Sequence, residues 1–197
     1  MNILLLVNEL RYTCGVTNHI LHLSRGLVQT GEVNLRIICG GGNGINRFSD
    51  INVNIISDER FLHLTRTFSG FISSINFLVK FLRQNKIDVI HSHYHYGAAI
   101  ARRASQLTSK TTVQTNHGIL EEIGKLKHFN ADKYIAINEH IKKYILENKI
   151  AVESNISFIR CGIPVPETMP EKVVNGKLKI LAASRFTYEK GLDIFIN

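Results

Sequence analysis

The chain has 197 residues, 44% of them hydrophobic, and a formal net charge of +8, which excludes a mostly disordered protein. It has no apolar run of the ~18 residues that a membrane-spanning helix needs, and its apolar start lacks the basic residues and cleavage site of a secretion signal. Its three cysteines, Cys14, Cys39 and Cys161, are odd in number and far apart, which favours reduced thiols in a cytoplasm.

Short apolar runs alternate with segments of helical periodicity along most of the chain. In chain order, the predicted strands are 2–7, 35–39, 53–56, 87–90, 111–115, 133–136 and 156–159. The predicted helices are 16–31, 71–86, 97–107 and 139–148. Near-continuously apolar strands are typical of a parallel sheet that is covered on both faces. The pattern therefore predicts an α/β, doubly wound, mostly parallel sheet of the Rossmann-like kind.

A break rich in proline and charge divides the chain. We expect one domain over residues 1–163, a linker over 164–176, and the incomplete start of a second domain over 177–197. The last segment opens with a predicted strand, Leu178–Ala183, followed by a helix start. One strand and one helical turn cannot bury a core, so we expect more chain to complete that domain.

Ligands of such sheets bind at the carboxyl ends of the strands. After the first strand, Gly15 stands at a helix start, where it can admit a phosphate to backbone N–H groups, although a plain tight turn explains it too. After the fourth strand, His91, His93 and His95 point to one side of an extended segment. Three imidazoles on one side can bind zinc; the alternative is that they line the core or the ligand cleft.

Two further strand ends carry polar residues. His117 and Gly118 follow the fifth strand, where the imidazole can donate a hydrogen bond and the glycine admits close backbone contact. After the predicted strand Leu178–Ala183, Arg185 and Lys190 offer a guanidinium and an ammonium that together suit a diphosphate. The competing interpretations are that His117 is hydrogen-bonded within the protein, and that Arg185 and Lys190 are solvated loop cations.

The positive charge is concentrated between residues 60 and 120, where Asp88 is the only acid. The basic residues there are Arg60, Arg66, Lys80, Arg83, Lys86, Arg102, Arg103 and Lys110. Such a stretch attracts phosphate, nucleic acid or an anionic membrane, or is a solvated face without a partner.

Five segments follow one another in a characteristic order: Cys14–His19, Asp88–His93, Thr115–Gly118, Ser154–Ile163 and Ser184–Gly191. They read Cys-Gly-Val-Thr-Asn-His, Asp-Val-Ile-His-Ser-His, Thr-Asn-His-Gly, Ser-Asn-Ile-Ser-Phe-Ile-Arg-Cys-Gly-Ile and Ser-Arg-Phe-Thr-Tyr-Glu-Lys-Gly. Over nearly the whole chain this order resembles the retaining nucleotide-sugar glycosyltransferases of glycosyltransferase family 4. The resemblance implies the GT-B fold, in which two doubly wound domains face each other across a cleft.

The resemblance also implies roles for residues on the donor side. Gly15 would present backbone N–H groups to the donor phosphates, and His117 would contact the donor sugar near its reacting carbon. Arg185 and Lys190 would hold the diphosphate and stabilise it as a leaving group. It implies no cofactor and no bound metal, because the donor nucleoside diphosphate sugar is a substrate and these two cations supply the positive charge.

On the acceptor side, the resemblance implies that His91, His93 and Gly118 shape the cleft. The acceptor would be a hydroxyl of a cell-surface glycan or a glycolipid such as lipopolysaccharide. Residues 60–110, with Phe61–Phe68 as the first contact, would meet an anionic membrane from the cytoplasmic side.

Three departures from the family pattern stand out. Cys14 replaces a usual glycine, and Cys161 replaces a usual asparagine. The family's glutamate pair, which holds the nucleotide ribose and sugar, falls in a part of the second domain that this chain lacks. We therefore expect the chain alone to be inactive.

The alternative functions are a GT-B epimerase or phosphorylase, and a zinc-binding module that uses His91, His93 and His95. Nucleic-acid binding ranks lowest, because no reader motif is present.

Overall fold

The computed structural model describes residues 1–62, 67–119, 131–165, 168, 180–184 and 186–196. The chain divides into two compact units, Met1–Pro164 and Val165–Asn197. The first unit contains the sheet and the residues of the candidate site, and the second contains two short helical turns.

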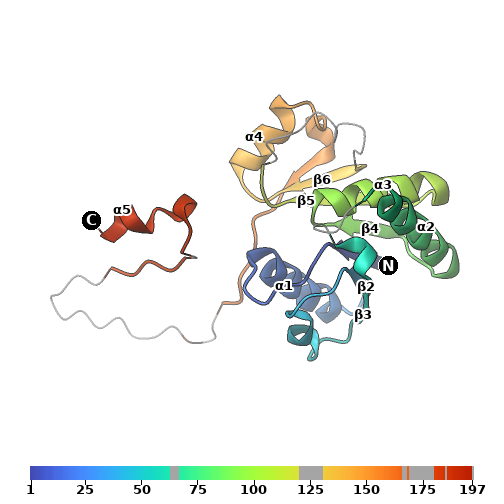
Figure 1. Ribbon diagram of the computed structural model, residues 1–197, viewed down its shortest axis with the longest axis horizontal. Coiled ribbons are helices and arrows are strands. Elements are labelled where there is room, and N and C mark those ends of the chain that lie inside the picture. Colours follow the sequence, from blue (N-terminus) through green and yellow to red (C-terminus); the bar gives the residue numbers. More distant parts are fainter. Residues whose placement is uncertain (63–66, 120–130, 166–167, 169–179, 185, 197) are drawn as a thin grey trace. The chain divides into compact units, whose positions relative to one another are not determined.

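A parallel sheet forms the centre of the first unit (Figure 1). Its strands are β1 Asn2–Val7, β2 Asn34–Cys39, β3 Asn54–Ser57, β4 Val89–Ser92, β5 Thr111–Asn116, β6 Lys133–Ala136 and β7 Ile156–Phe158. Their spatial order is β3-β2-β1-β4-β5-β6-β7, and all neighbouring pairs are parallel. The predicted α/β doubly wound sheet is confirmed. Strand order reverses between β1 and β4, so the crevice at their carboxyl ends is the position where such sheets bind ligands.

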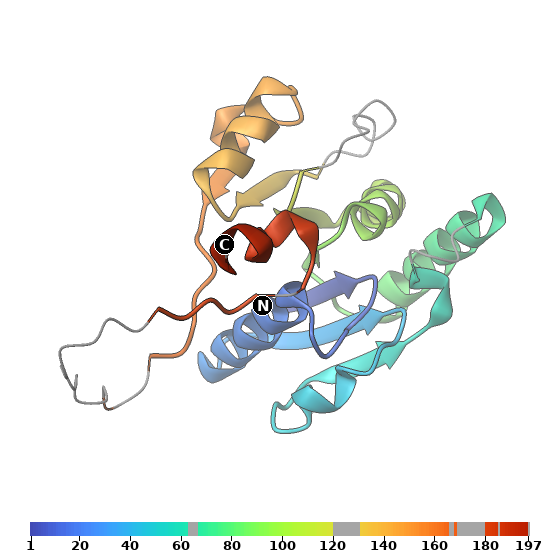
Figure 2. The same cartoon turned by 60° about the vertical axis from the view of Figure 1, so that its left-hand side comes forward.

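Four longer helices connect the strands: α1 Gly15–Gln29, α2 Phe68–Gln84, α3 His95–Thr108 and α4 Glu139–Glu147. The side chains of β1 alternate between two cores. Leu5 packs in one core with Ile20 of α1. Leu4 and Leu6 pack in the other, with residues of α2 and α3. Helices α2 and α3 lie side by side in both views (Figures 1 and 2). The sheet is therefore covered on both faces, as its apolar strands predict.

Helix α2 begins three residues earlier than its apolar periodicity predicts. The Thr67 hydroxyl accepts a hydrogen bond from the Gly70 N–H at 3.0 Å and so caps the helix at Phe68. A threonine cap satisfies one of the N–H groups that the first turn leaves without a partner. The polar cap, rather than the first buried side chain, sets this boundary.

The second unit contains a 3-10 turn, η4 Tyr188–Lys190, and a short helix, α5 Leu192–Ile196. The strand predicted over Leu178–Ala183 is not seen in its described part: residues 180–183 are irregular and exposed. A strand forms by pairing with a neighbour, and the described part of this unit offers none. Across the described residues, no helix combines the length and apolar character needed to cross a bilayer.

Candidate active site

Strand register places histidines on one face of the sheet at its carboxyl edge. His91 of β4 pairs with Leu5 on one side and with Val113 on the other. Leu5 belongs to the core that packs against α1. His91 therefore faces α1, and His93, two residues further on, continues on the same side because strand side chains alternate.

The neighbouring strand and helix add two more histidines. Thr115 and His117 follow Val113 at two-residue steps, and His19 projects from α1. The ring centroids of His19 and His117 are 4.8 Å apart, and those of His93 and His117 are 5.5 Å apart. His93 Nδ1 lies 3.2 Å from His117 Nε2, within hydrogen-bond distance. We call His19, His93 and His117 the histidine cluster.

His91 lies beneath the histidine cluster. Its ring centroid is 4.4 Å from that of His93, and its Nε2 lies 2.8 Å from the Thr115 hydroxyl. The hydroxyl therefore fixes the His91 ring, and this buried imidazole supports His93 from inside the sheet.

Burial keeps these imidazoles neutral. It lowers the pKa of His91 to about 3 and that of His117 to about 4, and repulsion from neighbouring histidines adds to the effect. The pKa values of His93 and His19 are lowered by burial too. Neutral imidazoles each offer one donor and one acceptor nitrogen, which suits sugar hydroxyls. They do not carry the positive charge that a diphosphate needs.

The zinc alternative needs His91, His93 and His95 on one side of an extended segment. The structure does not place His95 there, because β4 ends at Ser92 and α3 begins at His95. His95 Nδ1 instead lies 3.1 Å from Gln114 Nε2. Gln114 pairs with Ser92, which pairs with Leu6, so it belongs to the face that packs against α2 and α3. The change from strand to helix turns His95 away.

The amino end of α1 is open beside the histidine cluster. Gly15 is the first residue of the helix, and apart from its chain neighbours and the helix's own backbone no atom lies within 4 Å of the position that a Cβ would take there. The preceding residue, Cys14, makes no side-chain cap. Helix α3 also begins without a side-chain cap, whereas Thr67 caps α2 and Asn138 caps α4. The two helices that follow β1 and β4 thus begin without an oxygen cap from a side chain, and the start of such a helix favours an anion.

The pKa of the Cys14 thiol is affected by the N–H groups at this helix start. Its sulfur lies 3.7 Å from the Tyr94 hydroxyl. Burial works against ionisation of the thiol, but hydrogen bonding from the Thr17 and Val16 N–H groups and from Tyr94 outweighs it, so the pKa of Cys14 is lowered. The same N–H groups would favour a phosphate at this position.

Several buried polar atoms at this edge have no hydrogen-bond partner within the described structure. They are Asn8 Oδ1, Thr17 Oγ1, His93 Nε2 and both side-chain polar atoms of Asn116. A buried polar group without a partner costs about 1–3 kcal/mol, so such groups are rare unless a ligand satisfies them. Their position at the ends of β1, β4 and β5 and on α1 indicates a site prepared for a polar ligand.

The structure brings together only part of the predicted site. His91, His93 and His117 meet, and Gly15 begins the helix that carries His19. Gly118 follows β5 and is exposed.

Two predicted cations are not in the first unit. Lys190 lies in the 3-10 turn of the second unit, and Arg185 falls outside the described residues.

Sequence reasoning missed His19, Asn8 and Asn116 as site residues. A signal existed for His19, because it stands one helical turn after Gly15 and so shares its face. Asn8 directly follows the apolar strand β1, and Asn116 is the last residue of β5. Polar residues at such points face the ligand crevice of a parallel sheet.

The basic stretch is partly neutralised by acids outside it. Arg60 pairs with Asp58, and Arg102 pairs with Asp132 at 2.7 Å. Lys80 and Arg83 are exposed on α2. Arg60 and Lys80 help to line a groove of about 570 Å³, together with Ser69, Ile72, Ser73, Asn76 and Phe77. Within Phe61–Phe68, the predicted membrane contact, residues 63–66 lie outside the described structure.

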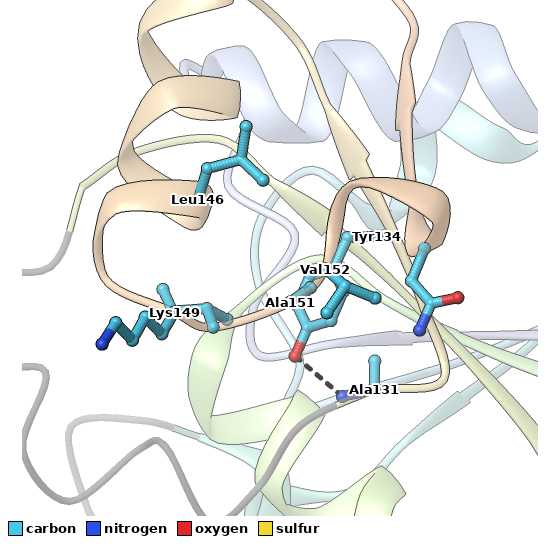
Figure 3. Close-up of a pocket in the computed structure, with 8 residues that line it drawn as sticks. Ala131, Tyr134, Leu146, Lys149, Ala151 and Val152 are labelled. Carbon is cyan, nitrogen blue, oxygen red and sulfur yellow. Dashed lines mark hydrogen bonds between the residues drawn. The ribbon is translucent and has the colours of Figure 1, made fainter.

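A second pocket of about 600 Å³ lies at the opposite edge of the sheet (Figure 3). Its lining includes Tyr134 near the amino end of β6, and Leu146 and Lys149 near the end of α4. The Ala131 N–H donates a hydrogen bond to the Tyr134 hydroxyl at 2.9 Å across its rim (Figure 3). The pocket is distant from the carboxyl ends of the strands and is separate from the histidine cluster.

Comparison with protein families gives one match, to Glycosyltransferase Family 4, over residues 13–166. The match begins two residues before α1 and covers all the strands from β2 to β7. None of the curated proteins matches the chain.

Solved structures share the fold at low sequence identity. A glycosyltransferase from Rickettsia africae ESF-5 is 18% identical, with a TM-score of 0.68 over 80% of this chain and 42% of its own. The lipopolysaccharide outer core galactosyltransferase WaaB is 14% identical, with a TM-score of 0.68 over 90% of this chain and 50% of its own. Anabaena Alr3699/HepE in complex with UDP is 14% identical, with a TM-score of 0.63 over 83% of this chain and 44% of its own. The chain therefore spans half or less of each of these structures.

Proposed function

The chain belongs to glycosyltransferase family 4, and on that premise we propose that it is the acceptor-side domain of a sugar-transferring enzyme. The enzyme moves a sugar from a nucleoside diphosphate sugar to a hydroxyl of a cell-surface glycan or glycolipid, with retention at the anomeric carbon. The fold shared with a lipopolysaccharide galactosyltransferase and with a UDP-bound protein supports these substrate classes.

The neutral histidine cluster beside the open start of α1 is the main support for this function. His117 hydrogen-bonds the donor sugar near its reacting carbon. His91 and His93 shape the cleft between donor and acceptor, and the exposed Gly118 leaves room for the sugar. Imidazoles held neutral by burial suit hydroxyl groups, and the unpartnered nitrogen of His93 gives such a ligand a place to bind.

The diphosphate is held by charge from two sources. Gly15 and the first turn of α1 offer backbone N–H groups to the phosphates. Arg185 and Lys190 add a guanidinium and an ammonium, which stabilise the negative charge that develops on the leaving diphosphate. This arrangement uses no cofactor and no metal.

The second unit is the start of a second domain, and the whole of that domain is needed to complete the enzyme. Its apolar side chains support this assignment, since Leu181 is 90% exposed and Phe186 is 93% exposed. Apolar groups of this size are buried in a complete domain. The glutamate pair expected to hold the nucleotide would belong to that domain, so the chain alone transfers no sugar.

The enzyme works at an anionic membrane on the cytoplasmic side. The exposed cations Lys80 and Arg83 on α2 support this, as does Phe68 at the start of that helix, which is 83% exposed. Cations near an anionic leaflet contribute about 1 kcal/mol each to membrane binding.

Labelled nucleoside diphosphate sugars test the proposed reaction. The enzyme with a complete second domain is incubated with each donor, with and without lipopolysaccharide or another glycolipid acceptor. We expect label in the acceptor, with the anomeric configuration of the donor, and no turnover by the 197-residue chain. Interconversion of donors without acceptor would identify an epimerase instead, and turnover by the chain alone would refute the need for a second domain.

A further inference from the structure

We infer that the histidine cluster is also a binding site for Zn²⁺ or a similar divalent transition ion. Its members come from three separate elements, α1, the turn after β4 and the end of β5, and the fold alone brings them together. Among the described residues, His19, His93 and His117 form the one group of three potential metal ligands, with ligand atoms all within 4.8 Å of one another.

The spacing of the cluster is close to that of a zinc site. Zinc binds imidazole nitrogens at about 2.0–2.1 Å in a tetrahedron, which puts ligand nitrogens about 3.4 Å apart. His93 Nδ1 and His117 Nε2 are already 3.2 Å apart. Because all ligand atoms of the cluster lie within 4.8 Å of one another, a rotation of the His19 side chain that moves its nitrogen by about 1–1.5 Å completes the site. Its ring is half-buried and already lies beside the rings of His93 and His117.

The chemistry of the cluster suits a borderline metal. Imidazole is a ligand for zinc, copper, iron and nickel, and it binds them in its neutral form. His93 is 2% exposed, and the ring nitrogen that faces His117 is Nδ1, so Nδ1 is its ligand atom for the ion. His91 is not a member of this group, and its Nε2 lies 2.8 Å from the Thr115 hydroxyl. Three protein ligands leave the fourth position to water, as in zinc sites that are open to exchange.

The inferred site has a consequence that rests on the proposed function. His117 would serve both the sugar and the metal, so the two ligands exclude each other. Zn²⁺ would then inhibit sugar transfer, although the transfer itself uses no metal.

Metal titration of the 197-residue chain tests the site without any nucleotide sugar. Calorimetry with Zn²⁺ under reducing conditions, in the absence of chelators, should give one ion per chain. Co²⁺ in place of Zn²⁺ should give the absorption of a tetrahedral ion with nitrogen and oxygen ligands and no thiolate charge-transfer band. Failure of the proposed sugar transfer would leave these results unchanged, so the two proposals fail separately.

Matched variants locate the ion. His19→Gln and His117→Gln should each weaken Zn²⁺ binding by at least about tenfold, since even changes outside the ligand set have effects of 10–100-fold. His140→Gln, at an exposed position on α4, and His95→Gln, beside Gln114, should leave it unchanged. Circular dichroism of each variant checks its fold.

Two results would contradict the zinc site. The first is that the chain does not bind one Zn²⁺ ion, and the second is that His19→Gln or His117→Gln binds Zn²⁺ with wild-type affinity. A thiolate band in the Co²⁺ spectrum of the unmodified chain would also do so, and this readout does not depend on the folding of any variant.

Discussion

At the residue scale, Asp132 joins β5 to the start of β6. One of its carboxylate oxygens accepts hydrogen bonds from the Thr112 N–H and hydroxyl, each at 2.8 Å, and the other accepts from Arg102 at 2.7 Å. Burial of the carboxylate opposes its ionisation, but these bonds prevail and lower the pKa of Asp132. Because the carboxyl is 41% exposed, solvent screening reduces the value of the ion pair.

Asp132→Asn should therefore lower the free energy of unfolding by about 1–2 kcal/mol at neutral pH. Since its folded pKa lies below the unfolded value, the contribution of Asp132 is present above that unfolded value and is lost as the pH falls through the folded pKa. The difference between wild type and variant should shrink in acid. Urea denaturation across this pH range measures it.

Asp50→Asn is the control for this prediction. Asp50 pairs with Arg25 at 2.8 Å, but its side chain is 60% exposed. Such surface pairs contribute about 0–1 kcal/mol. Equal losses in the two variants, or a loss in Asp132→Asn that does not change with pH, would contradict the role given to Asp132.

The individual histidines show how much of the site can be predicted from the sequence. His91, His93 and His117 could be predicted as cleft residues because each lies at or just after the end of a strand. His95 could not be placed correctly, since its direction depends on where β4 ends and α3 begins. For His19, the helix period places it on the same face of α1 as Gly15, but its contact with His93 and His117 also depends on α1 packing over the face that carries His91.

At the element scale, glycines after β2 hold the loop that leads into α1. The Leu10 N–H donates to the Gly41 carbonyl at 2.9 Å, and the Gly44 N–H donates to the Leu10 carbonyl at 2.7 Å. Gly42 has φ +122°, and a Cβ there would lie 2.3 Å from the Leu10 carbonyl oxygen. Only glycine fits this position, because both the backbone angle and the space exclude a side chain.

Gly42→Ala should therefore destabilise the chain by about 2–4 kcal/mol, from backbone strain and overpacking together. The matched change, Gly26→Ala within α1, should stabilise it by about 0.5–1 kcal/mol, because no atom lies within 4 Å of its Cβ position and alanine favours helix. Thermal and urea unfolding of both variants provide the measurement. Equal effects of the same sign would refute the close approach of Gly42 to Leu10.

Strands and helices of the first unit could be predicted because local pattern and tertiary burial agree there. The seven predicted strands correspond to β1–β7, and the inner strands are largely buried in a sheet covered on both faces. The boundary of α2 depends on a hydrogen bond from Gly70 to Thr67, which apolar periodicity does not report. The strand predicted over Leu178–Ala183 is absent from residues 180–183, its described part, for a different reason, because pairing is not a local property.

At the scale of the whole molecule, the sheet order fixes where the site lies. An α/β fold and a ligand crevice at the carboxyl ends could be predicted from strand alternation alone. The face on which the histidines meet could not, because it depends on the register between β1, β4 and β5. The distribution of charge is also a whole-molecule property, since acids outside the basic stretch pair with Arg60 and Arg102.

We expect the chain to bind anionic vesicles more tightly than zwitterionic ones, and to be released by salt. The double variant Lys80→Glu/Arg83→Glu should weaken binding at least about tenfold. Lys143→Glu/Lys149→Glu, at exposed positions on or just after α4, should have a smaller effect for the same change in charge. Vesicle co-sedimentation measures all three proteins.

Equal binding to the two kinds of vesicle would contradict the membrane contact. Equal loss in the two double variants would indicate that net charge, and not the α2 surface, determines attachment.

The central claim is that the histidine cluster contacts the sugar during transfer. Its most direct test is kcat of the enzyme with a complete second domain, measured for His117→Gln and for the exposed control His140→Gln. Loss of a hydrogen bond made in the transition state lowers kcat by about 10²–10³-fold, so we predict a fall of at least about 100-fold for His117→Gln and wild-type kcat for His140→Gln. A kcat for His117→Gln within about twofold of wild type would contradict the claim, because loss of such a bond costs far more.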